Sequence, residues 1–118
     1  MFAPDEIRTD ARLYMLELEG VPVAQFLDFR LEAGRARLVL ENGLSADLTL
    51  DHWFDATAAN PEGSDRSGAV VALDAKSQEI GRLSFATAHL AIYEGPQHDH
   101  HNAQGPVTIL ALDCQGLA

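Results

Sequence analysis

The sequence has little cysteine, few basic residues and no long apolar run, and each shortage excludes a class of protein. Cys114 is the single cysteine among 118 residues, so no disulfide can form within the chain. No run approaches the roughly 18 apolar residues that a membrane-spanning helix requires, so we expect no membrane partner. Eight Lys and Arg residues stand against 18 Asp and Glu, giving a net charge of -10 that repels polyanions. We therefore expect no sequence-specific binding of nucleic acid.

Motifs for catalysis are also missing. No serine lies in a G-x-S-x-G motif, and no G-x-x-x-x-G-K or G-x-G-x-x-G loop is present to hold a phosphate. Cys114 lies in an alternating segment, where a small buried apolar residue would serve equally well. The sequence therefore predicts a protein that is not an enzyme and needs no cofactor.

Length and composition predict a single soluble domain that spans residues 1–118. The chain has a mass of 12.8 kDa and is 47% hydrophobic and 22% charged, which suits one hydrophobic core. Its first ten residues, MFAPDEIRTD, carry acids where a secretion signal carries bases, and no apolar run follows them. We expect residues 1–10 to form a flexible N-terminal segment and the chain to be synthesised in the cytoplasm.

Most of the chain shows the alternation of apolar and polar residues that is typical of strands. The predicted strands are 11–19, 21–32, 35–41, 69–74, 80–94 and 107–114. In the second strand the residues expected on the buried face are Val23, Leu27, Phe29 and Leu31. Turn-forming residues concentrate at 60–68 and 95–106, which we expect to be surface loops. About six strands at this spacing favour a small antiparallel β-barrel, and strand edges exposed in the monomer would invite pairing with a neighbour.

The stretch 41–59 allows two interpretations, of which the first is a hairpin. Asn42 and Gly43 both tolerate positive φ, and they would form a tight turn between two alternating segments. The strand after that turn would end near Leu50. This interpretation leaves two large aromatic residues in an exposed loop, which is an unfavourable place for them.

The second interpretation is a helix that is capped by Ser45 and runs to about Ala59. Large apolar residues recur in it at helical spacing: Leu50, Trp53 and Phe54. Asp47 would then lie in the first turn, where the helix dipole favours an acid. Because this interpretation gives the aromatic residues a stripe that packs on the barrel, we prefer one flanking α-helix.

Several short features follow one another in a characteristic order along the chain. The residues that carry this order are Gly43, Asp47, Leu50, Trp53, Phe54, Asp74, Gly95, Pro96, Gly116 and Leu117. They comprise a strand that ends in glycine, a helix with a Trp step, a hairpin with an acidic turn, and a closing strand before Gly-Leu. Over residues 13–117 this arrangement resembles the tail-tube family of contractile injection systems, which includes phage tail tubes, type VI secretion tubes and tubes of extracellular injection particles.

The resemblance implies a six-stranded barrel with one helix, six copies of which form a ring around a conduit for DNA or protein effectors. It also implies sheath, baseplate or hub proteins and tape-measure or effector cargo as partners, with assembly into a virion tail or injection particle. The family's long hairpin between the second and third strands is replaced here by Ala33-Gly34. The chain is therefore a short variant, either of the main tube or of a baseplate-proximal ring. Its acidic charge suits either the wall of a conduit or an ordinary soluble surface.

Residues at strand ends and on the helix are the candidates for contacts between subunits. They are Arg30, Glu32, Asp47, Leu50, Trp53, Phe54, Tyr93 and Leu117. For Trp53 and Phe54 the alternative is that the helix packs them against its own barrel, and the stripe pattern favours that alternative.

The sequence HDHH, residues 98–101, suggests a different function. His98, His100 and His101 together with Asp99 offer the nitrogen and oxygen ligands that zinc prefers. A structural zinc site normally needs four protein ligands, and no second ligand cluster is evident, so we expect no metal. The alternative is a small monomeric or dimeric β-module that binds a metal or ligand through this loop.

Overall fold

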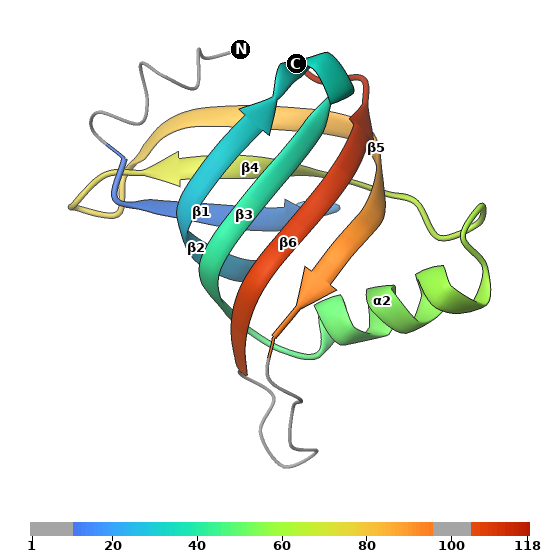
Figure 1. Ribbon diagram of the computed structural model, residues 1–118. Coiled ribbons are helices and arrows are strands. Elements are labelled where there is room, and N and C mark those ends of the chain that lie inside the picture. The colour runs from blue at the N-terminus through green and yellow to red at the C-terminus, as the bar shows by residue number, and fades with distance from the viewer. Residues whose placement is uncertain (1–10, 96–104) are drawn as a thin grey trace.

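The computed structural model describes residues 11–95 and 105–118, and its strands and helix are shown in Figure 1. The expected flexibility of residues 1–10 and the metal ligands of the 98–101 loop lie outside the described residues. The strands are β1 (Leu13–Leu18), β2 (Val21–Glu32), β3 (Arg37–Ser45), β4 (Arg66–Leu73), β5 (Glu79–Glu94) and β6 (Gly105–Gln115). The α-helix is α2 (Thr49–Ala59), and a short 3-10 helix, η1 (Ala33–Arg35), joins β2 to β3.

The six strands form a closed antiparallel barrel in the order β1-β2-β3-β6-β5-β4. This confirms the predicted mainly-β fold with one flanking helix. The barrel interior is filled by apolar side chains from every strand, with Phe26 and Leu110 among those that are fully buried. The expectation of exposed strand edges is wrong, because closure gives each strand a neighbour on both sides.

Helix α2 confirms the preferred interpretation of residues 41–59, but its predicted start is wrong. Ser45 is the last residue of β3, and its buried hydroxyl accepts a hydrogen bond from the Gly105 N–H over 3.1 Å. Pairing with β6 therefore continues through Asn42 and Gly43, and the capping residue is Leu48. The third strand is longer than predicted for the same reason.

Asp47 lies before α2 rather than in its first turn. Its Oδ1 accepts a hydrogen bond from the Thr49 N–H over 2.8 Å, so the side chain still satisfies a backbone donor at the start of the helix. Hydrogen bonds from Thr49 lower the pKa of Asp47. The acid in the first turn is Asp51.

The predicted buried face of β2 is wrong at Leu27, whose side chain is 61% exposed. Phe26 and Phe29 both point into the core, although strict alternation would place them on opposite faces. On β3 and β6 the inward and outward faces exchange at the same level of the barrel. Leu27 lies between the register pairs Phe26↔Gly43 and Asp28↔Glu41, which places it opposite Asn42.

Asn42 in turn lies opposite Thr108 on β6, between the pairs Glu41↔Ile109 and Gly43↔Val107. The backbone of Asn42 has φ 57°, a left-handed conformation that asparagine tolerates better than most residues. We call Leu27, Asn42 and Thr108 the reversal line, because inward and outward faces exchange there on all three strands. Gly43 is needed beside it, since a Cβ at this position would lie 2.3 Å from Phe26 Cδ1 and 2.6 Å from the Gln25 carbonyl oxygen.

Two strands run from one half of the barrel to the other and form its corners. β2 pairs with β1 as far as Tyr14↔Phe26, while its pairing with β3 continues to Glu32↔Arg37. β5 pairs with β4 up to Ala88, while its pairing with β6 continues to Glu94. We call residues 27–32 the β2 corner and residues 89–94 the β5 corner.

Candidate functional site

Helix α2 covers the β5 corner and is fastened to the barrel by two of the predicted contact residues (Figure 1). Leu50 is 0% exposed and Trp53 is 2% exposed, so both side chains pack into the chain's own core. The indole Nε1 of Trp53 donates a hydrogen bond to the Ser64 carbonyl oxygen over 2.8 Å. The chain itself therefore fills the surroundings of these two residues, as the core-packing alternative predicts for Trp53.

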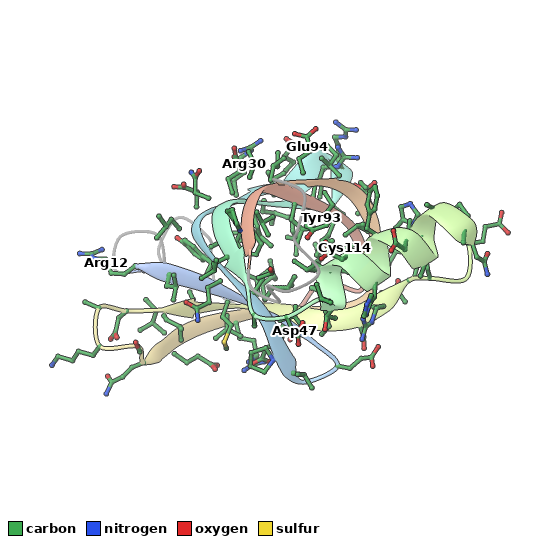
Figure 2. All side chains as sticks on the ribbon, turned by 90° about the horizontal axis from the view of Figure 1, so that it is seen from below. Arg12, Arg30, Asp47, Tyr93, Glu94 and Cys114 are labelled. Atoms are coloured by element: carbon green, nitrogen blue, oxygen red, sulfur yellow. The ribbon has the colours of Figure 1, made fainter. Side chains whose placement is uncertain are left out.

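Phe54 and Tyr93 form the outer part of the same contact, and Tyr93 lies on the side of the barrel next to α2 (Figure 2). Phe54 is 45% exposed, and its ring centroid lies 5.7 Å from that of Tyr93. The Tyr93 hydroxyl donates a hydrogen bond to Asp51 Oδ1 over 2.7 Å. Burial first, and then the bond to this carboxylate, raise the pKa of Tyr93. The hydroxyl therefore stays protonated and acts as a donor well into the alkaline range.

The β2 corner carries a cavity of about 460 Å³ instead of a helix. Its lining residues are Ala11, Tyr14, Leu27, Asp28, Phe29, Arg30 and Glu41. Tyr14 and Phe29 form the apolar floor, and their ring centroids are 5.3 Å apart. The corner thus combines a buried aromatic pair with charged side chains at the surface.

The charges at the β2 corner are arranged in pairs. Arg30 forms an ion pair with Glu41 on the neighbouring strand. The side-chain amide of Asn42 donates a hydrogen bond to Asp28 Oδ2 over 2.6 Å. Asp28 and Glu41 are direct register partners, so two acids face each other across the strands. Like charges in this position repel, and Arg30 offsets part of that repulsion.

The predicted contact residues fall into separate groups. Arg30 and Glu32 lie at the β2 corner, where Glu32 is half-buried and paired in register with Arg37. Leu117 packs against the core near the C-terminus, and the last residue exchanges two backbone hydrogen bonds with β5. Their role in an interface, like that of Phe54, Tyr93 and the exposed Asp47, stays a prediction.

Sequence reasoning missed two features of the surface. The first is the cavity, which could have been suspected because Phe26 and Phe29 are three residues apart, an odd spacing that would leave one of the two rings on the outer face of a regular strand. The second is exposed apolar area on β2 and β3, where Leu27 and Leu44 are both about half exposed or more. Leu44 lies two residues beyond Asn42, so the reversal line places both leucines on the outside of the barrel.

The acids of the chain outnumber its Lys and Arg residues, 18 to 8, and several basic side chains are paired with carboxylates. Arg37 bonds Asp113 through two nitrogens, at 2.7 and 3.1 Å, and this contact lowers the pKa of Asp113. Arg82 binds both Glu17 and Glu79. These bases are engaged within the chain, and the excess of acids over bases gives the net charge of -10.

The reactive side chains in the described ranges, 11–95 and 105–118, include Cys114 and His89. No three His, Cys, Asp or Glu side chains among them are grouped so as to hold a metal ion. Cys114 is buried on β6, and burial raises the pKa of its thiol to about 12. His89 Nδ1 lies 3.2 Å from Asp65 Oδ1 at the surface. A neutral buried thiol is a poor nucleophile, since the thiolate is the reactive form.

Helix α2 is too short and polar to cross a lipid bilayer, and no other helix in the described part of the chain could do so. No protein-family model, curated protein or solved structure matches this chain.

Proposed function

We propose that the chain is a structural subunit of the inner tube or baseplate-proximal ring of a contractile injection system. In this proposal six copies form a ring around a conduit for DNA or protein effectors, and no bond is made or broken. The observation that carries it is the closed antiparallel barrel of six strands with one helix between β3 and β4. That is the architecture implied by the resemblance to tail-tube proteins.

The electrostatics of the surface support a conduit. The chain has a net charge of -10, and at least two of its arginines are already bound to carboxylates within the chain. A wall with excess carboxylates repels DNA and acidic proteins, so cargo would pass without sticking. The partners in this proposal are the sheath, baseplate or hub proteins and the tape-measure or effector cargo.

Barrel closure restricts how neighbouring copies could meet. Each strand already has two strand neighbours, so a ring would be held by side chains on the outer faces. The outer face of β2 and β3 offers Leu27 and Leu44, and helix α2 offers Phe54. Because β2 and β3 are joined by η1 and Ala36 alone, a long hairpin that reaches the next ring is absent from this connection. Rings of this protein would therefore stack through other contacts.

Native mass spectrometry of the tag-free protein over a range of concentrations tests the proposal. We expect a dominant hexamer that persists when a chelator is added. A monomer or dimer with bound metal, which changes state when the metal is removed, would overturn the proposal in favour of the His98–His101 loop.

A pair of variants makes the same experiment more specific. The double variant L27S/L44S removes the apolar side chains from the proposed contact face and should lower the hexamer fraction several-fold. The matched control is Ile80→Ser, which changes an exposed apolar residue near the start of β5. Equal loss of hexamer in both proteins would show that the β2–β3 face is not the contact surface.

A further inference from the structure

Apolar side chains gather on the outer side of the barrel over β1, β2, β3 and β4. Tyr14 and Ala72 belong to the core, so the residues before and after them on β1 and β4 face outward. Register pairs join Met15 to Gln25 and Gln25 to Leu44, and β1 is paired with β4 in the same way, which makes this surface continuous. We call its apolar members the apolar face: Leu13, Met15, Leu27, Leu44 and Leu73.

Bases without an ion pair border one end of the apolar face. Among the residues that the structure describes, the Lys and Arg side chains outside ion pairs are Arg12, Arg35 and Lys76. Arg12 donates its backbone N–H to the Leu73 carbonyl oxygen over 2.8 Å, and Lys76 lies in the turn that follows β4. The acid of this turn, Asp74, has its Oδ1 engaged by two backbone N–H groups. The end of the apolar face at Leu73 therefore offers two positive side chains to a partner.

The opposite side of the molecule is acidic. Residues 46–65 comprise α2 with its flanking turns, and they include no Lys or Arg. We call these residues the acidic flank, and its acids are Asp47, Asp51, Asp55, Glu62 and Asp65. Figure 1 shows α2 at the right of the barrel and the turn between β4 and β5 at the left. Figure 2 likewise shows Arg12 on the side away from α2.

An exposed aromatic ring lies within the acidic flank. Phe54 is 45% exposed, whereas Leu50 and Trp53 of the same helix are buried in the chain's own core. Ala58 lies one helical turn beyond Phe54 and is also exposed, so the helix surface beside the ring is small and apolar. Aromatic side chains are enriched in the interfaces between proteins. The acidic flank thus combines an aromatic side chain with negative charge, while the apolar face combines leucines with positive charge.

The two surfaces complement each other in polarity and in charge. Contact between two acidic flanks would be repulsive, because every copy carries a net charge of -10. We propose that the acidic flank of one copy docks on the apolar face of the next, with Phe54 against the leucines and the acids toward Arg12 and Lys76. This inference rests on the proposed function, since it names the two surfaces that would form the ring contact. Unlike surfaces that meet head to tail generate a ring when the rotation closes and a filament when it does not.

Two variants that each lose one surface test this pairing when they are mixed. F54A/D55K removes the ring and reverses a charge of the acidic flank, while L27S/L44S removes two leucines of the apolar face. We expect each variant alone to be monomeric in native mass spectrometry. An equimolar mixture should contain several-fold more heterodimer than either homodimer, because each variant retains one intact surface. Ile80→Ser is the matched control, and it should keep the oligomer of the unmodified protein.

The outcomes separate this inference from the proposed ring. A mixture without heterodimer, made from variants that have each lost the hexamer, would overturn the inference, because the contact would then join like surfaces. A hexamer that persists in F54A/D55K would also overturn the inference and would leave the proposed ring intact. Filaments of the unmodified protein, together with heterodimer in the mixture, would support the inference and overturn the proposed hexamer.

Lys76 is the single lysine of the chain, and it allows a test on the unmodified protein. A carbodiimide joins an amine to a carboxylate where the two lie in contact, so cross-linking a mixture of normal and isotope-labelled protein identifies contacts between copies. Peptide mass spectrometry should find Lys76 of one copy joined to acids within residues 46–65 of the other. The matched control is Lys76→Arg, which keeps the positive charge, removes the amine and should lose these cross-links.

Two results of the cross-linking would overturn the inference without any variant of uncertain folding. One is a set of cross-links between copies that joins Lys76 only to acids outside residues 46–65. The other is the absence of cross-links between Lys76 and a second copy under conditions in which the protein is a hexamer.

Discussion

The β5 corner and the β2 corner have the same strand geometry but different surroundings. At each one, a strand leaves the ladder of one neighbour while it continues in the ladder of another. At the β5 corner, helix α2 covers the strand with Trp53, Phe54 and a hydrogen bond to Tyr93. At the β2 corner, a cavity with a charged rim takes the place of the helix. One corner is thus covered by the chain's own helix, while the other is left with a cavity.

The lengths of the connections between strands explain why a helix covers the β5 corner and not the β2 corner. The segment between β3 and β4 is long enough to hold the whole of α2, whereas β2 and β3 are joined by the three residues of η1 and Ala36. A connection as short as this one cannot fold back over the β2 corner and cover it.

The comparison predicts the largest loss of stability at the indole that fastens α2. Trp53→Ala should lower the free energy of unfolding by about 3–5 kcal/mol, because it removes a buried aromatic side chain and leaves a cavity. Urea unfolding followed by circular dichroism measures the change. Phe54→Ala is the control, and its exposed ring should cost about 1 kcal/mol or less. Similar losses for both variants would show that α2 is not fastened mainly from its inner side.

A smaller effect is expected at the reversal line, beside the β2 corner. Gly43→Ala should destabilise the barrel by about 1–3 kcal/mol, because the new Cβ meets the backbone oxygen of Gln25 as well as the Phe26 ring. Gly34→Ala is a matched control in η1, where a Cβ meets nothing within 4 Å. The difference between their urea midpoints measures the cost of close packing. A tolerated Gly43→Ala would mean that β2 and β3 can separate at this line.

The hydrogen bond at the β5 corner should have a moderate effect that depends on pH. Tyr93→Phe is expected to cost about 1 kcal/mol at neutral pH, the usual contribution of one hydrogen bond. Because the folded state raises the pKa of Tyr93, its contribution is complete below the unfolded tyrosine value of about 10 and declines above it. The free energy of unfolding should therefore fall less steeply above pH 10 or so in Tyr93→Phe. Tyr14 is common to both proteins, so a parallel fall in the two would contradict the assignment to Tyr93.

The smallest effect is expected for the ion pair at the rim of the β2 corner. Arg30→Ala should change the free energy of unfolding by roughly 0.2–1 kcal/mol, because the pair with Glu41 is exposed to solvent. The difference from the unmodified protein should shrink when the salt concentration is raised from low to about 1 M. Urea midpoints at the two salt concentrations provide the check. A larger loss that persists in salt would show that Arg30 also has buried contacts.

The sequence predicts the strands well because their alternation is local and their turns are marked by glycine and polar residues. The positions of β1, β5 and β6 follow from that pattern with small errors at the ends. The helix was also predictable, since the spacing of Leu50 and Trp53 matches a helical stripe. Barrel closure and the pairing order could not be read from one strand at a time, because they depend on contacts between distant segments.

The candidate site was less predictable than the fold for the same physical reason. Ser45 has the chemistry of a helix cap, but its hydroxyl is engaged by Gly105, which is 60 residues away in sequence. Leu27 has the chemistry of a core residue, and it is exposed because three strands exchange faces together. The residues around Ser45 carry no signal of this bond, and the odd spacing of Phe26 and Phe29 is the local signal of the change at Leu27. The β2 cavity depends on both the exchange of faces and the end of the β1 ladder.

Because Cys114 is the single cysteine of the chain and is buried, its thiol can be used to detect transient opening of the barrel. Cys114 lies opposite Ala88 in the seam between β5 and β6, where its sulfur donates toward the Leu112 carbonyl oxygen at 3.6 Å. A labelling reagent can therefore reach it only when that seam parts or the whole chain unfolds. With one sulfhydryl per molecule, the rate at which label is incorporated reports a single opening event. Subunit assembly that tightens this seam could be followed by the slowing of that one rate.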